Sequence, residues 1–377
     1  MTANLHNSSF SAPSNNFSIE IESLRGIAAL LVVAGHFKLK IFGNIYGSLS
    51  SKPLVLFTTL VDSMLNPQST VLLFFTISGL VLGRQLRKNP IEGFPSFIAY
   101  LCRRGFRLFP LIWATTIFAF ILDSFVHHRN FALLFLNLTL NNISLNEVLW
   151  SIQVELWCSL FFPLLFWMFR TSGIIYNVLL FIGFAFLSYF VKTPIFMQFW
   201  VFFHAGLLVD VLSTNLNLSR FKNPLILLSA YLIFILAPEF SIGPRNWAYG
   251  CWQSWVLPEI IACPLILFFI VHNKNNSVNA FLRLSWIRYL GKISFSVYLI
   301  HFPILLYMLA KFPVDTISQI LIFSCGFFGS TILISGLAYR WIEIPFNNIG
   351  RKLYTYILTD LFSKTLHDKV NGALRKA

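Results

Sequence analysis

The sequence predicts an all-α integral membrane protein, built as a bundle of about ten transmembrane helices. Of its 377 residues, 56% are hydrophobic and 17% aromatic, while Asp, Glu, Lys and Arg together make up only 11%. Soluble domains carry about 25% charged residues, and the mean hydropathy here is +0.71. These values exclude a soluble enzyme, a disordered chain, a collagen and a secreted disulfide scaffold, and they leave a polytopic membrane protein.

Ten apolar segments are each about long enough to cross roughly 30 Å of hydrocarbon. We expect helices, because lipid offers no hydrogen-bonding partner to a free backbone group. The stretch 54–65 is too short to span and contains Asp62, so we expect an interfacial or re-entrant piece there. The ten expected spans are residues 24–42, 69–84, 106–123, 149–169, 174–191, 195–212, 224–238, 255–271, 293–310 and 318–339.

The basic excess of the chain is explained mostly by membrane topology. There are 28 Lys and Arg residues against 14 Asp and Glu, a net charge of +14. With ten spans and the N-terminus inside, 21 of the 28 cations fall on the inner side and 7 on the outer side, counting Lys38 and Lys40 as outer. The positive-inside rule describes this bias. Both termini are therefore expected in the cytoplasm, and no nucleic-acid partner is needed.

The organisation along the chain is that of one membrane domain with two tails. Residues 1–18 are rich in Asn and Ser, which predicts a disordered tail, and they lack the pattern of a cleavable signal peptide. Residues 19–345 are expected to form the transmembrane domain, and 346–377 a basic amphipathic cytoplasmic tail suited to the membrane surface. The five Cys are scattered without a C-x-x-C pair, so neither a disulfide framework nor a metal site is predicted.

Ionisable groups inside spans are costly, and each is a candidate functional residue. Arg25 and His36 lie in the first span, eleven residues apart, which on a helix is three turns plus about 20° and a rise of about 16.5 Å. Both therefore face the same way. They could contact two ends of one elongated ligand, or two ligands that meet from opposite sides. A snorkelling Arg and a hydrogen-bonded interhelical His are the structural alternative.

Three arginines, Arg103, Arg104 and Arg107, lie at the inner end of the third span with helical spacings of three and four. Planar guanidinium groups suit phosphate. On these residues alone, positive-inside anchoring or contact with anionic lipid headgroups is the simpler interpretation.

Two further spans carry polar groups on defined faces. Glu155, in LWSIQVELW, has Ser151 four residues earlier on its face; it is either a functional acid, a partner for a cation of another helix, or an interfacial group. Ser294, Tyr298 and His301 follow one another at i, i+4 and i+7, a stripe that lines a cavity or joins helices.

The remaining intramembrane polar groups are given structural roles. The Ser78–Gly79 pair in FFTISGLV is expected at a close helix contact, and Arg340 and Glu343, three apart, are expected to form a local ion pair. Three residues are expected to be packing polar groups: His204, Asp210 and Glu259.

The motifs, taken in order, resemble the membrane acyltransferase type 3 family. They are IESLRGIAALLVVAGHF, LFFTISGLVLGR, RRGFRLFPLIWA, LWSIQVELW, LGKISFSVYLIHFPI and WIEIPFNNIG. The resemblance runs from about residue 19 to 350. It implies an integral membrane O-acyltransferase of the inner (plasma) membrane, and many such proteins acetylate sugars of lipopolysaccharide O-antigen, exopolysaccharide or secreted glycans.

The resemblance also assigns roles to individual positions. Arg25 and His36 match the essential pair of the first span, and Arg104 and Arg107 match an Arg-x-x-Arg motif. The remaining matches are Glu155, an acidic residue of the fourth span, and His301 in the ninth span. The implied catalytic set is therefore His36, Glu155 and His301. The implied donor-binding set is Arg25, Arg104 and Arg107, with Arg103 beside them.

These assignments suggest a mechanism and leave a rival. Acetyl-CoA from the cytoplasm would bind through its phosphates, with its pantetheine arm along the face shared by Arg25 and His36. His36 would act as general base on a glycan hydroxyl, or carry a transient acetyl group, and Glu155 or His301 would orient it. The rival is a secondary transporter of an anionic solute or glycan, which ten spans and midplane polar residues also fit, although no inverted repeat is visible.

Overall fold

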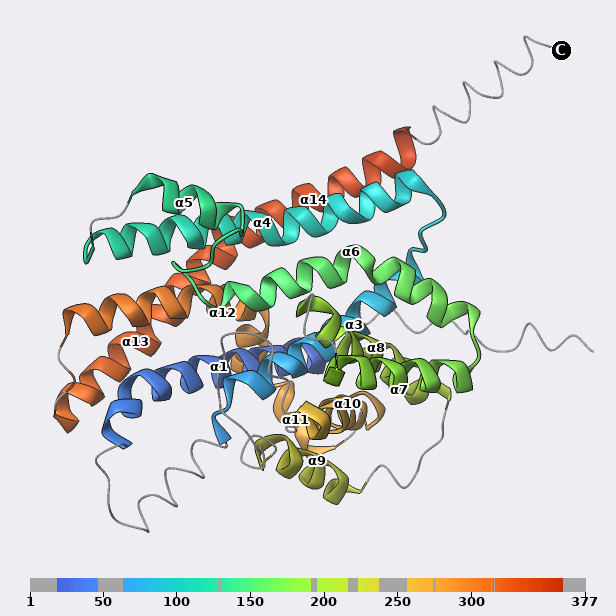
Figure 1. Cartoon of the computed structure of the whole chain (residues 1–377), viewed down its shortest axis with the longest axis horizontal. Coiled ribbons are helices and arrows are strands. Elements are labelled where there is room, and N and C mark those ends of the chain that lie inside the picture. The colour runs from blue at the N-terminus through green and yellow to red at the C-terminus, as the bar shows by residue number, and fades with distance from the viewer. Residues whose placement is uncertain are drawn as a thin grey trace, which may run out of the picture.

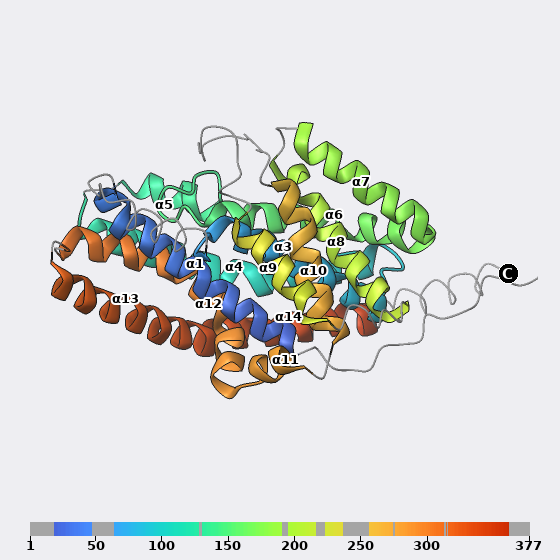
Figure 2. The same ribbon diagram turned by 90° about the horizontal axis from the view of Figure 1, so that it is seen from below.

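The computed structural model describes residues 19–46, 64–127, 130–190, 195–215, 223–236, 256–273, 276–312, 314 and 316–361. Every regular element within these residues is helical and none of them forms a strand, which confirms the predicted all-α class. The long helices lie side by side in an elongated bundle, as Figures 1 and 2 show from two directions. Residues 1–18, most of 54–65 and the tail beyond 361 lie outside the described residues.

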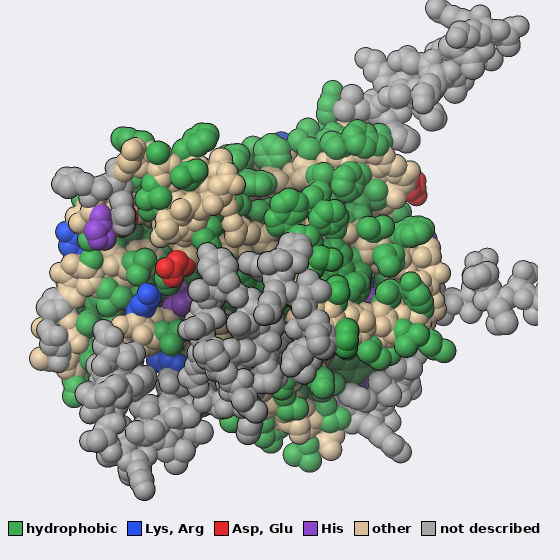
Figure 3. Space-filling view, in the orientation of Figure 1, with side chains coloured by type: hydrophobic (Ala, Val, Ile, Leu, Met, Phe, Trp, Pro, Cys, Tyr) green, Lys and Arg blue, Asp and Glu red, His purple; other side chains and the backbone are tan. Residues whose placement is uncertain are grey.

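Each of the ten predicted spans coincides with a helix. These are α1 (Ile19–Tyr46), α3 (Pro67–Lys88), α4 (Phe94–Ser124), α6 (Leu149–Thr171), α7 (Ile174–Phe190), α8 (Ile195–Asn215), α9 (Pro224–Leu236), α10 (Val256–His272), α12 (Ser285–Lys311) and α13 (Ile317–Ala338). By length and composition, six helical stretches of the described chain can cross a membrane, and three shorter apolar ones lie at 174–188, 224–236 and 258–272. On the face drawn in Figure 3, hydrophobic side chains are abundant among the described residues, and charged ones are few.

Helices α1 and α12 run parallel and in register. A Cβ added to Gly26 would overlap the backbone of Gly291, and one added to Gly291 would overlap the backbone of Glu22. Ten residues further along both helices, His36 contacts His301, again with a sequence separation of 265. The two glycines therefore allow a close approach of the kind small residues give in membrane bundles, and the helices stay together for about 15 Å.

Helices α3 and α8 form a second close pair. A Cβ on Gly79 would overlap the backbone of Phe203, which confirms the expected close contact at Ser78–Gly79. At one end of this pair, Arg84 Nε and Arg87 Nη2 bind the two carboxylate oxygens of Asp210 at 2.7 and 2.5 Å. Asp210 is therefore a packing group that joins the two helices.

The C-terminal helices return along α4. After α13 the chain passes through a π-helical turn, η3 (Tyr339–Glu343), into α14 (Ile344–Tyr356) and a second such turn, η4 (Ile357–Leu361). Figure 1 shows α14 beside α4, and Gly350 permits this contact because a Cβ there would lie 2.8 Å from the Cβ of Phe106. Two short helices complete the described fold: α5 (Phe131–Leu138) and α11 (Ser277–Leu282).

Candidate active site

His36 of α1 and His301 of α12 form a stacked, hydrogen-bonded pair inside the bundle. The distance from His36 Nδ1 to His301 Nε2 is 3.0 Å, and the ring centroids are 5.2 Å apart at an interplanar angle of 23°. His301 is fully buried, and Phe302 stands edge-on to His36 with ring centroids 5.3 Å apart. The structure thus joins two residues that the sequence could place only on separate helix faces.

The hydrogen bonds of this pair assign its tautomers. His301 Nδ1 lies 3.1 Å from the carbonyl oxygen of Val297, which can only accept, so Nδ1 carries the proton. In the neutral ring His301 Nε2 is then an acceptor, and it must receive the N–H of His36 Nδ1. His36 Nε2 is consequently left with a lone pair, the state that a general base requires.

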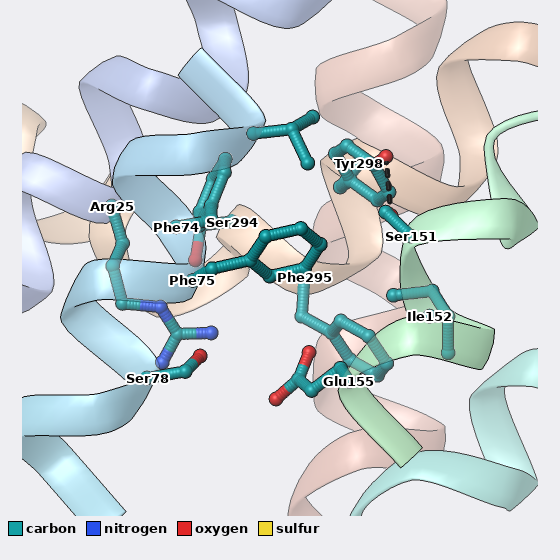
Figure 4. Close-up of a pocket in the computed structure, with 11 residues that line it drawn as sticks. Arg25, Phe74, Phe75, Ser78, Ser151, Ile152, Glu155, Ser294, Phe295 and Tyr298 are labelled. Atoms are coloured by element: carbon teal, nitrogen blue, oxygen red, sulfur yellow. Dashed lines mark hydrogen bonds between the residues drawn. The ribbon is translucent and has the colours of Figure 1, made fainter. Parts of the chain in front are cut away.

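A small pocket of about 30 Å³ lies between α1, α3, α6 and α12, and neither histidine of the pair is among the residues that line it. Its polar lining groups are Arg25, Glu155 and the hydroxyls of Ser78, Ser151, Ser294 and Tyr298; its apolar ones include Phe74, Phe75 and Phe295. In Figure 4 the guanidinium of Arg25 points toward Ser78 and into the space bordered by Glu155. The predicted stripe on α12 therefore lines a site: Ser294 and Tyr298 face the pocket, and the ring centroid of Tyr298 is 6.0 Å from that of His301.

The start of α6 fixes this part of α12. The hydroxyls of Ser151 and Tyr298 are 2.7 Å apart, and the Tyr298 hydroxyl also lies 3.2 Å from the Val148 carbonyl oxygen. Asn146 Nδ2 donates to the carbonyl oxygen of Leu299 at 2.9 Å. These bonds fix the turn of α12 that directly precedes His301. No pattern in the sequence points to Asn146.

A layer of buried charge lies at the Arg25 end of the pocket. Arg104 Nη2 binds Glu155 Oε1 at 3.0 Å and the Ser159 hydroxyl at 2.5 Å, and its side chain is only 7% exposed. The Tyr100 hydroxyl donates to the Ser159 carbonyl oxygen at 2.8 Å, which further ties α4 to α6. Glu155 therefore belongs with the arginines, and its direct partner is Arg104.

Arg25 and Arg107 lie in the same layer but differ from Arg104 in their partners. Both interact electrostatically with Glu155 and with Glu343, but among the described side chains neither forms an ion pair. Three guanidinium groups and two carboxylates leave one net positive charge in this layer. Since Arg104 is bound to Glu155, Arg25 of α1 and Arg107 of α4 are the groups of this layer best placed to receive an anion.

Glu343 is the site residue that the sequence reasoning misplaced. It does not pair with the exposed Arg340 in the described structure; its buried carboxylate accepts a hydrogen bond from the Ser296 hydroxyl of α12. The π-helical turn explains the difference, because it shifts the side chains relative to α-helical spacing. Glu343 stands in the motif WIEIPFNNIG, but its partner Ser296 is evident only from the fold.

The other expected packing groups are buried in structural positions. His204 Nε2 lies 2.9 Å from the Asn177 carbonyl oxygen, and the rings of Phe169 and Phe184 surround it. Glu259 is fully buried and accepts a contact from the Cys263 thiol at 3.4 Å. Within the described residues, no group of three or more His, Cys, Asp or Glu side chains could hold a metal ion.

The sequence matches one protein-family model over most of its length. A model described as an acyltransferase domain matches residues 18–339, most of the chain. The chain belongs to the acyltransferase type 3 family. Comparison with curated proteins and with solved structures finds no match.

Family membership makes the protein a membrane acyltransferase and confirms the predicted enzyme class. It therefore supports acyl transfer over the transporter alternative. The matched range also contains α1, α4, α6 and α12, the four helices that carry the predicted site residues.

Proposed function

We propose that this acyltransferase moves an acetyl group from cytoplasmic acetyl-CoA to a hydroxyl of a surface or lipid-linked glycan, such as lipopolysaccharide O-antigen or exopolysaccharide. The observation that carries the proposal is the His36–His301 pair, whose hydrogen bonds leave His36 Nε2 as an acceptor. On the same helix, three turns away, Arg25 lines a pocket and supplies a cation.

The donor enters at the arginine end. Arg25 and Arg107 bind its phosphates through charge-assisted hydrogen bonds, which are about twice as strong as neutral ones. Arg104, which the resemblance places in the donor-binding set, instead holds Glu155 in position. Glu155 in turn interacts electrostatically with the other two arginines. The hydroxyls of Ser78 and Ser294 offer partners to the amide groups of a pantetheine arm in the pocket.

The reaction needs one base and no net proton change. His36 Nε2 removes the proton of the acceptor hydroxyl while the oxygen attacks the thioester carbonyl carbon. The tetrahedral intermediate collapses, the carbon–sulfur bond breaks, and the thiolate of CoA receives the proton from His36. The products are an O-acetyl ester and CoA. His301 acts as a positioning residue, because its bond to His36 Nδ1 selects the tautomer and supports the imidazolium that forms.

A histidine replacement tests this proposal. Substitution His36→Ala should abolish acetylation of the glycan by membranes that still contain the protein, and His127→Gln is the matched control. His127 is an exposed histidine paired with Asp123 at 2.8 Å, outside the site. Retained activity in His36→Ala would remove the core of the mechanism.

The acceptor is tested separately on whole cells. With the N-terminus in the cytoplasm, the His36 end of α1 faces outward, where a surface glycan arrives. Mass spectrometry of surface glycans with and without the gene should show one acetyl group fewer on a defined sugar. Accumulation of a solute without any covalent change would instead favour transport.

A further inference from the structure

The surface next to the arginine layer contains two cations that the catalytic proposal does not use. Arg103 is on the Arg107 side of α4, four residues earlier, and its side chain turns toward α14. Its guanidinium carbon lies 5.3 Å from the ring centroid of Tyr354. Arg351, on the exposed side of α14, is close enough to Arg103 for the two charges to repel.

This juxtaposition is built into the packing of α14 on α4. A Cβ on Gly350 would lie 2.8 Å from the Phe106 Cβ and 3.7 Å from the Arg103 Cα. The absence of a side chain at Gly350 therefore lets α14 reach α4 at the turn that carries Arg103. The same contact brings the neighbouring Arg351 close to Arg103. The Tyr354 ring stacks on the Arg103 guanidinium and limits the conformations of that side chain.

In the part of the chain that the structure describes, no acid compensates these two guanidinium groups. Among the described side chains, no carboxylate forms an ion pair with Arg103 or Arg351, and the charged groups acting on Arg103 are Arg104 and Arg351. Two cations held together without a counter-charge favour a bound anion, and planar guanidinium pairs suit phosphate.

The location connects this pair to the donor site. Arg103 and Arg107 are one turn apart on one face of α4, and Arg107 interacts electrostatically with Arg25 at the pocket. Arg104 interacts electrostatically with both Arg103 and Arg107, so a series of guanidinium groups runs from Arg351 at the surface through Arg103, Arg104 and Arg107 to Arg25. Such a series follows the charge distribution of CoA, whose nucleotide carries a phosphate monoester beyond its diphosphate.

We propose that Arg351 and Arg103, the latter held by Tyr354, form a phosphate subsite that binds the 3′-phosphate of the donor nucleotide. The proposal rests on acetyl-CoA being the donor. A phosphate group could also come from an anionic lipid headgroup, which offers the same chemistry at the same depth.

The test compares CoA with dephospho-CoA, which lacks only the 3′-phosphate. We would measure the binding of both by the full-length protein in nanodiscs, with and without phosphatidylglycerol. The wild type should bind CoA about tenfold more tightly than dephospho-CoA, the effect of one charge-assisted contact. Arg351→Gln should remove this preference by weakening CoA alone, and Arg351→Lys should restore part of it.

Lys352→Gln is the matched control, because it removes the same charge from the adjacent exposed position of α14. It should keep the preference for CoA. Equal binding of CoA and dephospho-CoA by the wild type would overturn the subsite while leaving CoA as the donor. So would an Arg351→Gln effect confined to the dependence on phosphatidylglycerol, which would assign the pair to lipid.

Failure of the proposed function gives a different result. Adenosine 3′,5′-bisphosphate is measured alongside, since it carries the phosphate monoester without the pantetheine arm. Arg351-dependent binding of this probe, without transfer from acetyl-CoA to any glycan, would support the subsite and contradict the reaction.

Discussion

His36 and His301 are separated by 265 residues, yet their Nδ1 and Nε2 atoms are 3.0 Å apart. The separation equals that of Gly26 and Gly291, two positions where a Cβ on one helix would overlap the backbone of the other. Because the helices are parallel and in register, the glycine contact and the histidine contact depend on each other. The geometry of the proposed base is thus set by how two helices pack.

Removing His301 should slow the chemical step and leave acceptor binding unchanged. We expect His301→Ala to lower kcat about 10²-fold, in the range of general-base effects, because His36 loses the partner that selects its tautomer. His301→Gln should retain more activity, since an amide oxygen can accept from His36 Nδ1. The measurement is kcat and KM for the acceptor across a pH series.

A different outcome would contradict this role. An unchanged pH profile with a raised acceptor KM would mean that His301 contacts the glycan and does not position His36. The His127→Gln variant again serves as the control for removal of a histidine outside the site.

The close crossing of α1 and α12 should be sensitive to one methyl group. Gly26→Ala places a Cβ against the backbone of Gly291, and backbone cannot move aside cheaply. We expect a loss of about 1–3 kcal/mol in stability, typical of overpacking, together with a loss of activity. Thermal unfolding in detergent and acetyl transfer would be followed in parallel.

Gly183→Ala provides the comparison, because a Cβ at Gly183 on α7 meets no atom within 4 Å. It should be neutral or slightly stabilising, since alanine favours helix. Equal losses of stability in the two variants would contradict the claim that the α1–α12 contact at Gly26 has no room for a Cβ.

The Arg104–Glu155 ion pair should behave as a buried pair in which each partner depends on the other. Arg104→Gln or Glu155→Gln alone leaves a charge with its partner missing, a change that costs about 3–5 kcal/mol in buried pairs. Glu155 is 19% exposed, so we expect the lower end of that range. The double variant should recover part of the loss when unfolding is measured as a double-mutant cycle. Strict additivity would show that the pair does not act as a unit.

Arg25 and Arg107 should affect the donor more than the acceptor. Arg107→Gln removes charge-assisted bonds worth about 1.5–3 kcal/mol, so KM for acetyl-CoA should rise about tenfold to a hundredfold. Arg25→Lys keeps the charge but loses the planar fork, and it should give a smaller rise. Initial rates at varied acetyl-CoA and fixed acceptor test this, and an unchanged KM would exclude phosphate binding by these two residues.

Hydropathy and helical periodicity are enough to predict the all-α class, the ten apolar segments and most residues of the candidate site. Hydropathy places each span, because lipid forces every backbone group in a span into a helix. Helical periodicity gives the face shared by Arg25 and His36 and the stripe that ends at His301. Hydropathy and helical periodicity depend only on neighbouring residues in the sequence, so they predict spans and faces without knowledge of which helices pack together.

Which of these groups come into contact depends on how the helices pack. The periodicity of α4 makes its three arginines equivalent candidates. Packing nevertheless places Arg104 on Glu155, Arg107 near Arg25, and Arg103 against Tyr354 of α14. Glu343 bonds to Ser296 because a π-helical turn breaks the spacing on which the expected ion pair depended. A contact between residues that are hundreds of positions apart depends on the register of two helices and on glycines that let them approach. Local sequence patterns do not specify that register.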